Sequence, residues 1–305
     1  MAGARLLIGY DGSNDADGAI RAAGRLLPGS EAVVVHVHDP TIELERAALA
    51  RIALPDSVIA ASMHDYEDAA EIASRGRTVA AEVGLQASSV VRPSASASRG
   101  LCEAATERAA DVVVCGSRGR GGLARTYLGS TASSLLHHSP CPVLVVPTAE
   151  HDLTGPIVIG FDASDGARAA VRTAAKLFPG RSAVVMHVWA SPVRRSYVGS
   201  ALLATPMQAV SETAGDLDET FAAEAHDVAD EGAALAREQG LDATARVVEG
   251  PRGWRGVTAA AKTERAALLV VGCRGRGAVA ATVLGSVSFG VVHHAELPVL
   301  VSRGQ

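Results

Sequence analysis

The sequence predicts an α/β protein made of two tandem copies of one unit, each a parallel sheet with helices on both faces. Three observations predict this fold: the length of 305 residues, an internal repeat, and an alternation of short β-branched runs with longer alanine-rich stretches. At about 150 residues per domain, the length allows two domains that each bury a core. Apolar residues make up 48% and charged residues 20%, which is typical of globular proteins rather than disordered or fibrous ones.

Composition excludes several classes of function. The 28 basic and 33 acidic residues give a net charge of −5, so no overall positive field attracts nucleic acid or an anionic membrane. With 4 Phe, 4 Tyr and 2 Trp, stacking platforms for bases are disfavoured. The four cysteines form no C-x-x-C pair, which argues against a zinc site or a disulfide framework and fits a reducing compartment. No apolar run has the length of a signal peptide or a membrane helix, so we expect a cytoplasmic protein.

The internal repeat is the main organising feature. Residues 7–13 (LIGYDGS) correspond to residues 158–164 (VIGFDAS) at an offset of 151. From Gly84 and Gly240 onward the offset is 156, so the second copy carries a net insertion of five residues. We therefore expect one domain over residues 1–148 and a second over residues 155–305, joined by a short polar linker.

Each copy alternates predicted strands and helices. The near-continuous apolar strands indicate a parallel sheet that right-handed crossovers cover on both faces. The connections at residues 40–64 and 191–215 are predicted to be irregular. In the first copy the predicted strands are 6–10, 32–37, 88–91, 112–115 and 143–146, and the helices 15–26, 65–83, 99–108 and 130–137. In the second copy the strands are 157–161, 183–189, 243–248, 268–271 and 299–301, and the helices 165–177, 218–239, 256–263 and 286–293.

A glycine-rich loop follows the fourth predicted strand of each copy. Residues 116–119 read GSRG and residues 272–275 read GCRG, and in both copies nine residues and a Gly-Ser pair follow. Glycines at a strand end let the backbone approach a ligand closely, and successive N–H groups can form an anion-binding nest. The Gly-Ser pair opens a helix, where N–H groups and the dipole favour a phosphate. Four loop arginines would neutralise its charge: Arg118, Arg120, Arg274 and Arg276.

The alternative is that these loops are only tight strand-to-helix connections, as in many α/β folds. Identical nine-residue spacing in two copies favours a ligand, because packing alone does not demand it. Neither the P-loop pattern G-x-x-x-x-G-K-[ST] nor a Rossmann fingerprint after the first strand is present. The sequence therefore predicts a phosphate site of another kind.

Together these patterns resemble the universal stress protein family, in its tandem-domain, ATP-binding form. That family's nucleotide signature is G-x-x-G, nine residues, then G-[ST], and both copies carry it. The resemblance extends over residues 5–147 and 157–301 and includes the closing runs HHSPCPVLVVP and HHAELPVLVS. It implies an open five-stranded parallel sheet of strand order 3-2-1-4-5 in each copy, with the nucleotide at the carboxyl ends of strands one and four.

The resemblance also implies which residues bind nucleotide. Asp11 and Asp162 would accept hydrogen bonds from the ribose or base, while the plainer interpretation of an Asp before a helix is an N-terminal cap. Val37 and Val188 would flank the adenine, although a valine that ends a buried strand needs no ligand. The other implied contacts are Gly9, Gly116, Ser117, Arg118, Gly119, Arg120, Gly129, Ser130 and Thr131 in the first copy, and Gly160, Gly272, Cys273, Arg274, Gly275, Arg276, Gly285, Ser286, Val287 and Ser288 in the second.

These residues favour binding over turnover. Hydrolysis needs a positioned water, a base and usually a metal ligand near the γ-phosphate, and neither loop offers a carboxylate for that task. The leading interpretation is a stress-response regulator with one adenine-nucleotide site per domain, binding ATP with or without Mg²⁺. The alternatives are a slow ATPase of the same fold, or a scaffold that the nucleotide stabilises.

Other notable residues have simpler interpretations. The His pairs at 137–138 and 293–294 lie at predicted helix C-termini, which favour a cation, and no further ligand completes a metal site. Cys115 and Cys273 are interpreted as small buried residues rather than redox-sensitive thiols. The last strand of each copy is apolar and predicted at a sheet edge, which proteins seldom leave exposed. We therefore expect the copies to pack through these strands as an internal pseudo-dimer, and a homodimer of chains is compatible with the same pattern.

Overall fold

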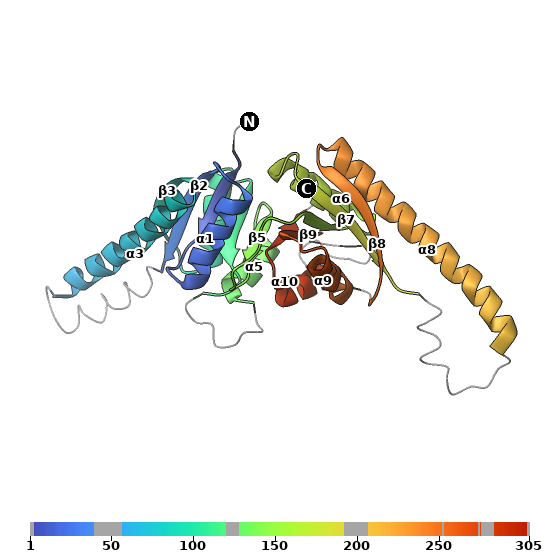
Figure 1. Cartoon of the computed structure of the whole chain (residues 1–305). Helices are drawn as coiled ribbons and strands as arrows, with labels where there is room; N and C mark the ends of the chain where they lie inside the picture. Colours follow the sequence, from blue (N-terminus) through green and yellow to red (C-terminus); the bar gives the residue numbers. More distant parts are fainter. Residues whose placement is uncertain are drawn as a thin grey trace. The chain divides into compact units, whose positions relative to one another are not determined.

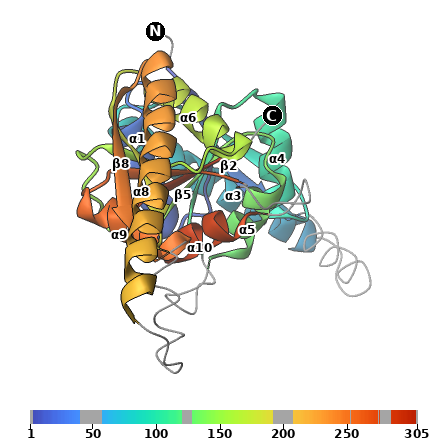
Figure 2. The ribbon, with the colours of Figure 1, turned by 90° about the vertical axis from the view of Figure 1, so that its right-hand side faces the viewer.

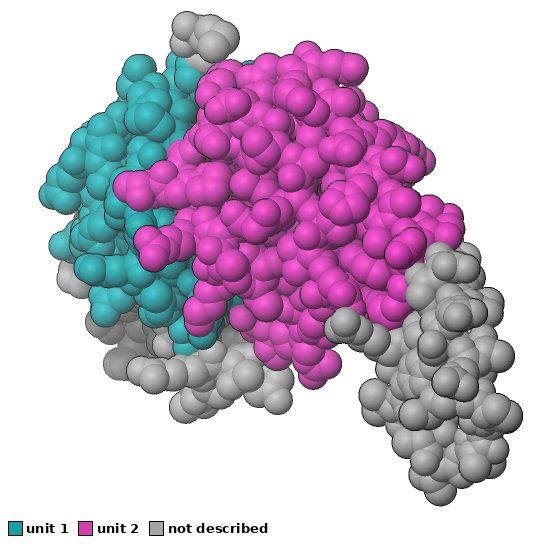
Figure 3. Space-filling model, turned by 45° about the vertical axis from the view of Figure 1, so that its right-hand side comes forward, with its two compact units in different colours: residues 1–153, 295–301 teal, residues 154–294, 302–305 magenta. Residues whose placement is uncertain are grey.

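The structure is a computed structural model that describes residues 3–39, 57–119, 128–191, 207–251, 253–273, 275 and 284–303. The chain forms two compact units, which Figure 3 colours separately. The first unit comprises Met1–Leu153 and Ala295–Val301, and the second comprises Thr154–His294 and Ser302–Gln305. The first unit therefore includes a segment that the sequence repeat assigns to the second copy.

The first unit is built around a sheet of strand order β3-β2-β1-β4-β5-β10. All neighbouring strands are parallel except β5 and β10, so the order 3-2-1-4-5 expected for the first copy is confirmed. Its elements are β1 (Arg5–Gly9), α1 (Asn14–Leu26), β2 (Glu31–His38), α3 (Ser57–Glu82), β3 (Gln86–Pro93), α4 (Ala97–Glu107), β4 (Val112–Gly116), α5 (Ser130–His138), β5 (Val143–Val146) and β10 (Val299–Ser302).

Helices cover both faces of this sheet. The helices α1 and α3 contact each other and the sheet (Figure 1), and α4 and α5, both labelled in Figure 2, form a second contacting pair. The central strands are buried from both sides: Leu7 and Ile8 of β1 and Val113 of β4 are all 0% exposed. Such burial explains why these strands are continuous apolar runs rather than alternating ones.

The second unit repeats this arrangement with the strand order β8-β7-β6-β9, all parallel. Its long helix α8 runs along the edge strand β8 (Figure 2). The elements are β6 (Ile157–Gly160), α6 (Asp165–Leu177), β7 (Ser182–Trp189), α8 (Met207–Glu238), β8 (Asp242–Glu249), α9 (Trp254–Thr263), β9 (Leu268–Gly272) and α10 (Ser286–His294).

Two predicted helices begin earlier than expected. The helix expected from residue 65 begins at Ser57, and the one expected from residue 218 begins at Met207, so the predicted irregular segments are partly helical. Pro55 and Pro206 stand just before these starts, where proline is favoured next to a helix. Polar and small residues weakened the apolar periodicity there. The rest of the predicted irregular segments lies outside the described residues.

The strands β5 and β10, which the sequence predicts at sheet edges, pair with each other. Their register places Val299 opposite Val145 and Leu300 opposite Leu144. Leu144 and Leu300 are 1% and 0% exposed. The pairing thus covers the apolar edge of the first unit that would otherwise present free backbone groups.

Candidate functional site

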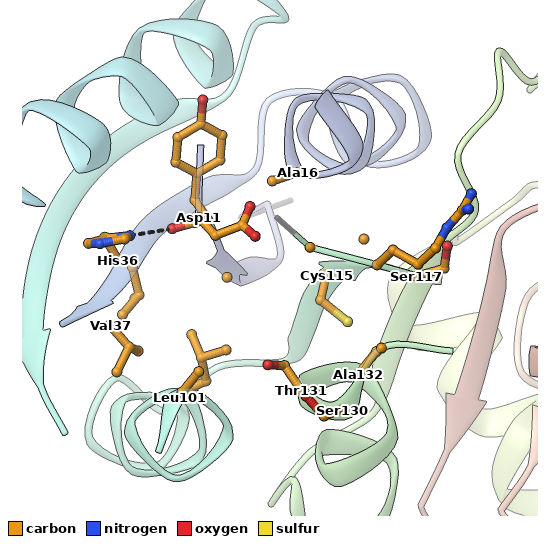
Figure 4. A pocket seen from close by; sticks show the side chains of 18 of the residues that line it. Asp11, Ala16, His36, Val37, Leu101, Cys115, Ser117, Ser130, Thr131 and Ala132 are labelled. Atoms are coloured by element: carbon orange, nitrogen blue, oxygen red, sulfur yellow. Dashed lines mark hydrogen bonds between the residues drawn. The ribbon is translucent and has the colours of Figure 1, made fainter. Parts of the chain in front are cut away.

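A cavity of about 470 Å³ lies at the carboxyl ends of β1 and β4. Crossovers leave β1 toward β2 and β4 on opposite sides, so this is the switch point where open α/β sheets bind ligands. Figure 4 shows His36 and Val37 at one end of the cavity, Ser117 at the other, and Asp11 across from Thr131. The volume suits a small organic ligand.

All first-copy residues predicted to bind nucleotide line this cavity, except Arg120, which lies outside the described residues. The predicted lining residues are Gly9, Asp11, Val37, Gly116, Ser117, Arg118, Gly119, Gly129, Ser130 and Thr131. The sequence did not predict the other lining residues as ligand contacts: Tyr10, Ala16, Val35, His36, Ala97, Leu101, Cys115, Leu128 and Ala132. Most of these are apolar and supply walls, which motif reading does not detect.

Asp11 does not cap the following helix. The N-cap of α1 is Ser13, whose side chain accepts a hydrogen bond from the Ala16 N–H at 3.2 Å. Asp11 instead accepts from the Ser13 N–H at 3.0 Å and lines the cavity. In the second unit Ser164 caps α6, and Asp162 accepts from the Ser164 N–H at 3.1 Å. The cap interpretation of both aspartates was therefore wrong, because the serine two residues later takes that position.

The described ends of the glycine loop have matching backbone hydrogen bonds in the two copies. The Gly129 N–H donates to the Ser117 carbonyl at 2.8 Å, and the Gly285 N–H donates to the Cys273 carbonyl at 2.8 Å. The loop thus leads directly to the start of α5 or α10. Gly129, the N-cap of α5, has no side chain to pair with the first N–H groups of that helix. Those groups suit an anion.

The loop glycines serve two different purposes. A Cβ on Gly116 would lie 3.1 Å from the Asp15 backbone, and one on Gly272 would clash with the Gly166 backbone. These two glycines therefore permit close packing of strand and helix, and Gly116 also lines the cavity. A Cβ on Gly119 would lie 2.5 Å from the Asp11 carboxylate, and one on Gly275 would lie 2.8 Å from Asp162. In both copies the loop thus passes directly against the aspartate.

Arg118 is already paired within the protein. Its Nε lies 3.5 Å from Asp15 Oδ2, and its guanidinium also donates to the Thr148 hydroxyl. Thr148 in turn donates to Asp15 Oδ2 at 2.6 Å. Arg118 lines the cavity as predicted, but its charge is shared with a carboxylate that the sequence did not associate with it.

The histidine at the adenine end of the predicted site is fixed by the backbone. His36 Nδ1 donates to the Tyr10 carbonyl at 2.8 Å, and His187 Nδ1 donates to the Phe161 carbonyl at 2.7 Å. Because a carbonyl only accepts, each Nδ1 carries a proton. The sequence signal for this shared feature is the His-Val pair that occurs at residues 36–37 and again at residues 187–188.

The second copy contains the corresponding residues with different surroundings. Gly160 ends β6, and Val188 lies in β7. Ser286 and Val287 are exposed at the start of α10, whereas Ser288 is buried and its hydroxyl donates to the Gly272 carbonyl at 2.5 Å. Ser288 therefore supports the loop from within rather than facing a phosphate as expected. Arg274 and Arg276 lie outside the described residues.

The remaining notable residues lie at helix ends or stack on one another. Both His pairs end their helices, α5 and α10, as expected. In the part of the chain that the structure describes, no three His, Cys, Asp or Glu side chains group as metal ligands would. Trp254, at the start of α9, stacks on His294 with ring centroids 4.0 Å apart. No described helix is long and apolar enough to cross a membrane.

The fold and this cavity define a doubly wound α/β protein with its candidate site at the switch point of the sheet. The family model of the universal stress protein family matches residues 4–147 and 154–303. The chain therefore belongs to the universal stress protein family, with two tandem family domains.

Several universal stress proteins are similar to this chain. A universal stress protein of Mycolicibacterium smegmatis is 30% identical over 98% of this chain and 96% of its own length. The crystal structure of a universal stress protein from Archaeoglobus fulgidus aligns with a TM-score of 0.59 and 18% identity, covering 99% of this chain and 98% of that one. A universal stress protein solved in complex with cAMP covers 49% of this chain and all of its own, with a TM-score of 0.35 and 20% identity.

Proposed function

We propose that this chain binds adenine nucleotide, with ATP as the leading ligand, and acts as a nucleotide-responsive regulator rather than a fast catalyst. The observation that carries the proposal is the convergence on one cavity of Asp11, the glycine loop and the start of α5. These groups supply a carboxylate for hydroxyl or amino donors at one side and N–H groups for an anion at the other.

The cavity suits the ligand in size and chemistry. Val35, Val37 and Leu101 supply apolar walls for a flat base, while Ser130 and Thr131 supply hydroxyls beside the helix N-terminus. Its volume of about 470 Å³ lies within the usual range of small-molecule sites. The matching loop hydrogen bonds in the second unit favour a second site, so we expect two nucleotides per chain.

The described residues favour binding over hydrolysis. Asp11 is the one carboxylate among the described residues that line the cavity, and Gly119 lies directly against it. Rapid phosphoryl transfer requires both a general base and metal ligands. Among the described lining residues, Asp11 is the only carboxylate available for either role. We therefore expect ATP to be retained, and ADP to appear at most slowly.

The direct test is to denature the purified protein and identify any released nucleotide by absorbance and mass spectrometry. We expect adenine nucleotide approaching two per chain, and a rise in melting temperature when ATP is added to stripped protein. Protein that releases no nucleotide and shows no ATP-dependent stabilisation would refute the proposal. Following ADP release over time then separates a regulator from a slow ATPase.

Gly119→Ala tests the assigned residues. The added Cβ would displace the Asp11 carboxylate, so we expect ATP affinity at the first site to fall about tenfold, the equivalent of one lost charge-assisted hydrogen bond. Gly18→Ala is the matched control, because a Cβ at Gly18 in α1 meets nothing within 4 Å. This control should stabilise the helix by about 0.5–1 kcal/mol and leave ATP affinity unchanged. Unchanged affinity in Gly119→Ala would contradict the assignment of Asp11.

A further inference from the structure

Asp15 and Arg118 form an ion pair beside the cavity of the first copy. Asp15 lies in the first turn of α1, and its Oδ2 is 3.5 Å from Arg118 Nε. The side chains are only 14% and 21% exposed, and Thr148 bridges them by hydrogen bonds to both. Solvent therefore screens this pair less than it screens an exposed one.

Arg118 is the charge that a phosphate would use. Among the described residues that line the cavity, it alone carries a guanidinium or ammonium group. A phosphate that reaches Arg118 must compete with the Asp15 carboxylate and is repelled by it. Each further negative charge on the ligand increases that repulsion, whereas an uncharged adenosine does not experience it.

The second copy provides a natural comparison. At the repeat offset of 151, Asp15 corresponds to Gly166 in α6. The described ends of the two loops have matching backbone hydrogen bonds, so the exchange of Asp15 for Gly166 is a side-chain difference beside a similar backbone. A carboxylate cannot hold a loop arginine from that position in the second copy.

We propose that Asp15 is a specificity-determining residue of the first-copy site, where it lowers the preference for ATP over less highly charged adenine compounds. The second-copy site, with Gly166, lacks this restraint and favours ATP more strongly. This inference rests on the proposed function. Two otherwise similar sites in one chain would then respond to different ratios of ATP to AMP.

The test is Asp15→Asn in the full-length chain, with ATP, AMP and adenosine as ligands. Hydrogen exchange of peptides covering residues 112–119 reports on the first site separately from residues 268–273 of the second. For Asp15→Asn we expect ATP affinity at the first site to rise about five- to tenfold, as for removal of one partly screened charge. AMP affinity should rise less, and adenosine affinity should change less than about twofold, because it carries no phosphate.

Two control variants separate local charge from other effects. Glu82→Gln removes an exposed charge at the end of α3, just before β3 begins. This position is at the amino ends of the strands, whereas the cavity is at their carboxyl ends, so all three affinities should stay unchanged. Thr148→Val keeps both charges and removes only the bridging hydroxyl, so the ratio of ATP to adenosine affinity should stay within about twofold.

The possible failures are distinguishable. Equal changes for all three ligands, or weaker ATP binding in Asp15→Asn, would overturn this inference while leaving nucleotide binding intact. Weaker ATP binding in Asp15→Asn would mean that Asp15 orients Arg118 toward the phosphate. If no ligand protects either site in any variant, the proposed function itself fails.

Discussion

The Cys115 thiol lies at the wall of the cavity and is 5% exposed. Burial raises its pKa from 9.0 to about 12, so the nucleophilic thiolate is strongly disfavoured in the folded protein. Its interpretation as a small buried residue is confirmed, and Cys273 is likewise buried at 8% exposure. Proximity to a candidate ligand therefore does not make Cys115 reactive.

This burial predicts a pH dependence of stability. The folded state favours the protonated thiol, so the contribution of Cys115 is complete below pH 9 and is lost as the pH rises toward 12. Between pH 8 and pH 10.5 we expect the wild type to lose about 1–2 kcal/mol more unfolding free energy than Cys115→Ala. Urea denaturation of both proteins at the two pH values measures the difference, and equal losses would contradict the prediction.

Residue-level prediction from the sequence worked where a motif fixes both identity and position. Asp11, Gly119 and Thr131 were placed correctly at the cavity because strand ends and helix starts converge there. The partners of charged side chains were not predictable: Arg118 meets Asp15 and Thr148, which come from other elements. Such contacts depend on how α1 and the segment after β5 pack against the loop.

At the scale of elements, the two units exchange the acidic and the basic side chain between the paired helices on one face of the sheet. In the first unit, Tyr10 donates to Asp17 of α1 at 2.6 Å and accepts from Arg75 of α3 at 3.0 Å. In the second unit, Arg168 of α6 pairs with Glu231 of α8. In each unit a guanidinium donates to the carbonyl after the site aspartate, that of Gly12 or Ala163. Both units thus keep this hydrogen bond, although the arginine stands on α3 in the first unit and on α6 in the second.

Exchanging the charges in the first unit should therefore be tolerated. Asp17→Arg alone would place two arginines together and should cost about 1 kcal/mol, allowing for the exposure of Arg75. The double variant Asp17→Arg with Arg75→Glu should recover most of that loss, because it recreates the arrangement of the second unit. A double-mutant cycle by urea denaturation measures the coupling, and additive losses would refute it.

Helix and strand positions were mostly predictable, because each apolar period reflects burial on one or two faces. The helix over residues 165–177 was predicted at its observed bounds, where Ser164 caps a regularly spaced apolar stripe. The starts of α3 and α8 were not predicted, because their first turns lack a continuous apolar stripe. A helix is predicted from the apolar stripe on its buried face, so its ends are missed where that stripe is interrupted.

At the scale of the whole molecule, the boundaries of the sequence repeat and of the compact units differ at β10. Residues 299–301 belong to the second copy by sequence and to the first unit by contacts. The repeat could not reveal this, because strand partners at a sheet edge depend on which edge is available. From the apolar character of β5 and β10 we expected the two copies to pack through these strands, but that character did not fix their antiparallel register.

Leu300→Ala should therefore destabilise the first unit. Leu300 is fully buried opposite Leu144, and removing its side chain should cost about 2–5 kcal/mol. Hydrogen exchange of residues 143–146 should accelerate in this variant. Val287→Ala, at a 37% exposed position in the second copy, should have little effect. Unchanged exchange in β5 would show that β10 does not support it.

The position of β10 also constrains how the chain folds during synthesis. A ribosome produces residues 299–301 long after residues 1–153, so β5 is made well before the strand that pairs with it. Until then the edge of β5 is exposed on the nascent chain and open to incorrect pairing. Two copies that look independent in sequence are therefore not independent during synthesis, because the sheet of the first unit takes its strand β10 from the second copy.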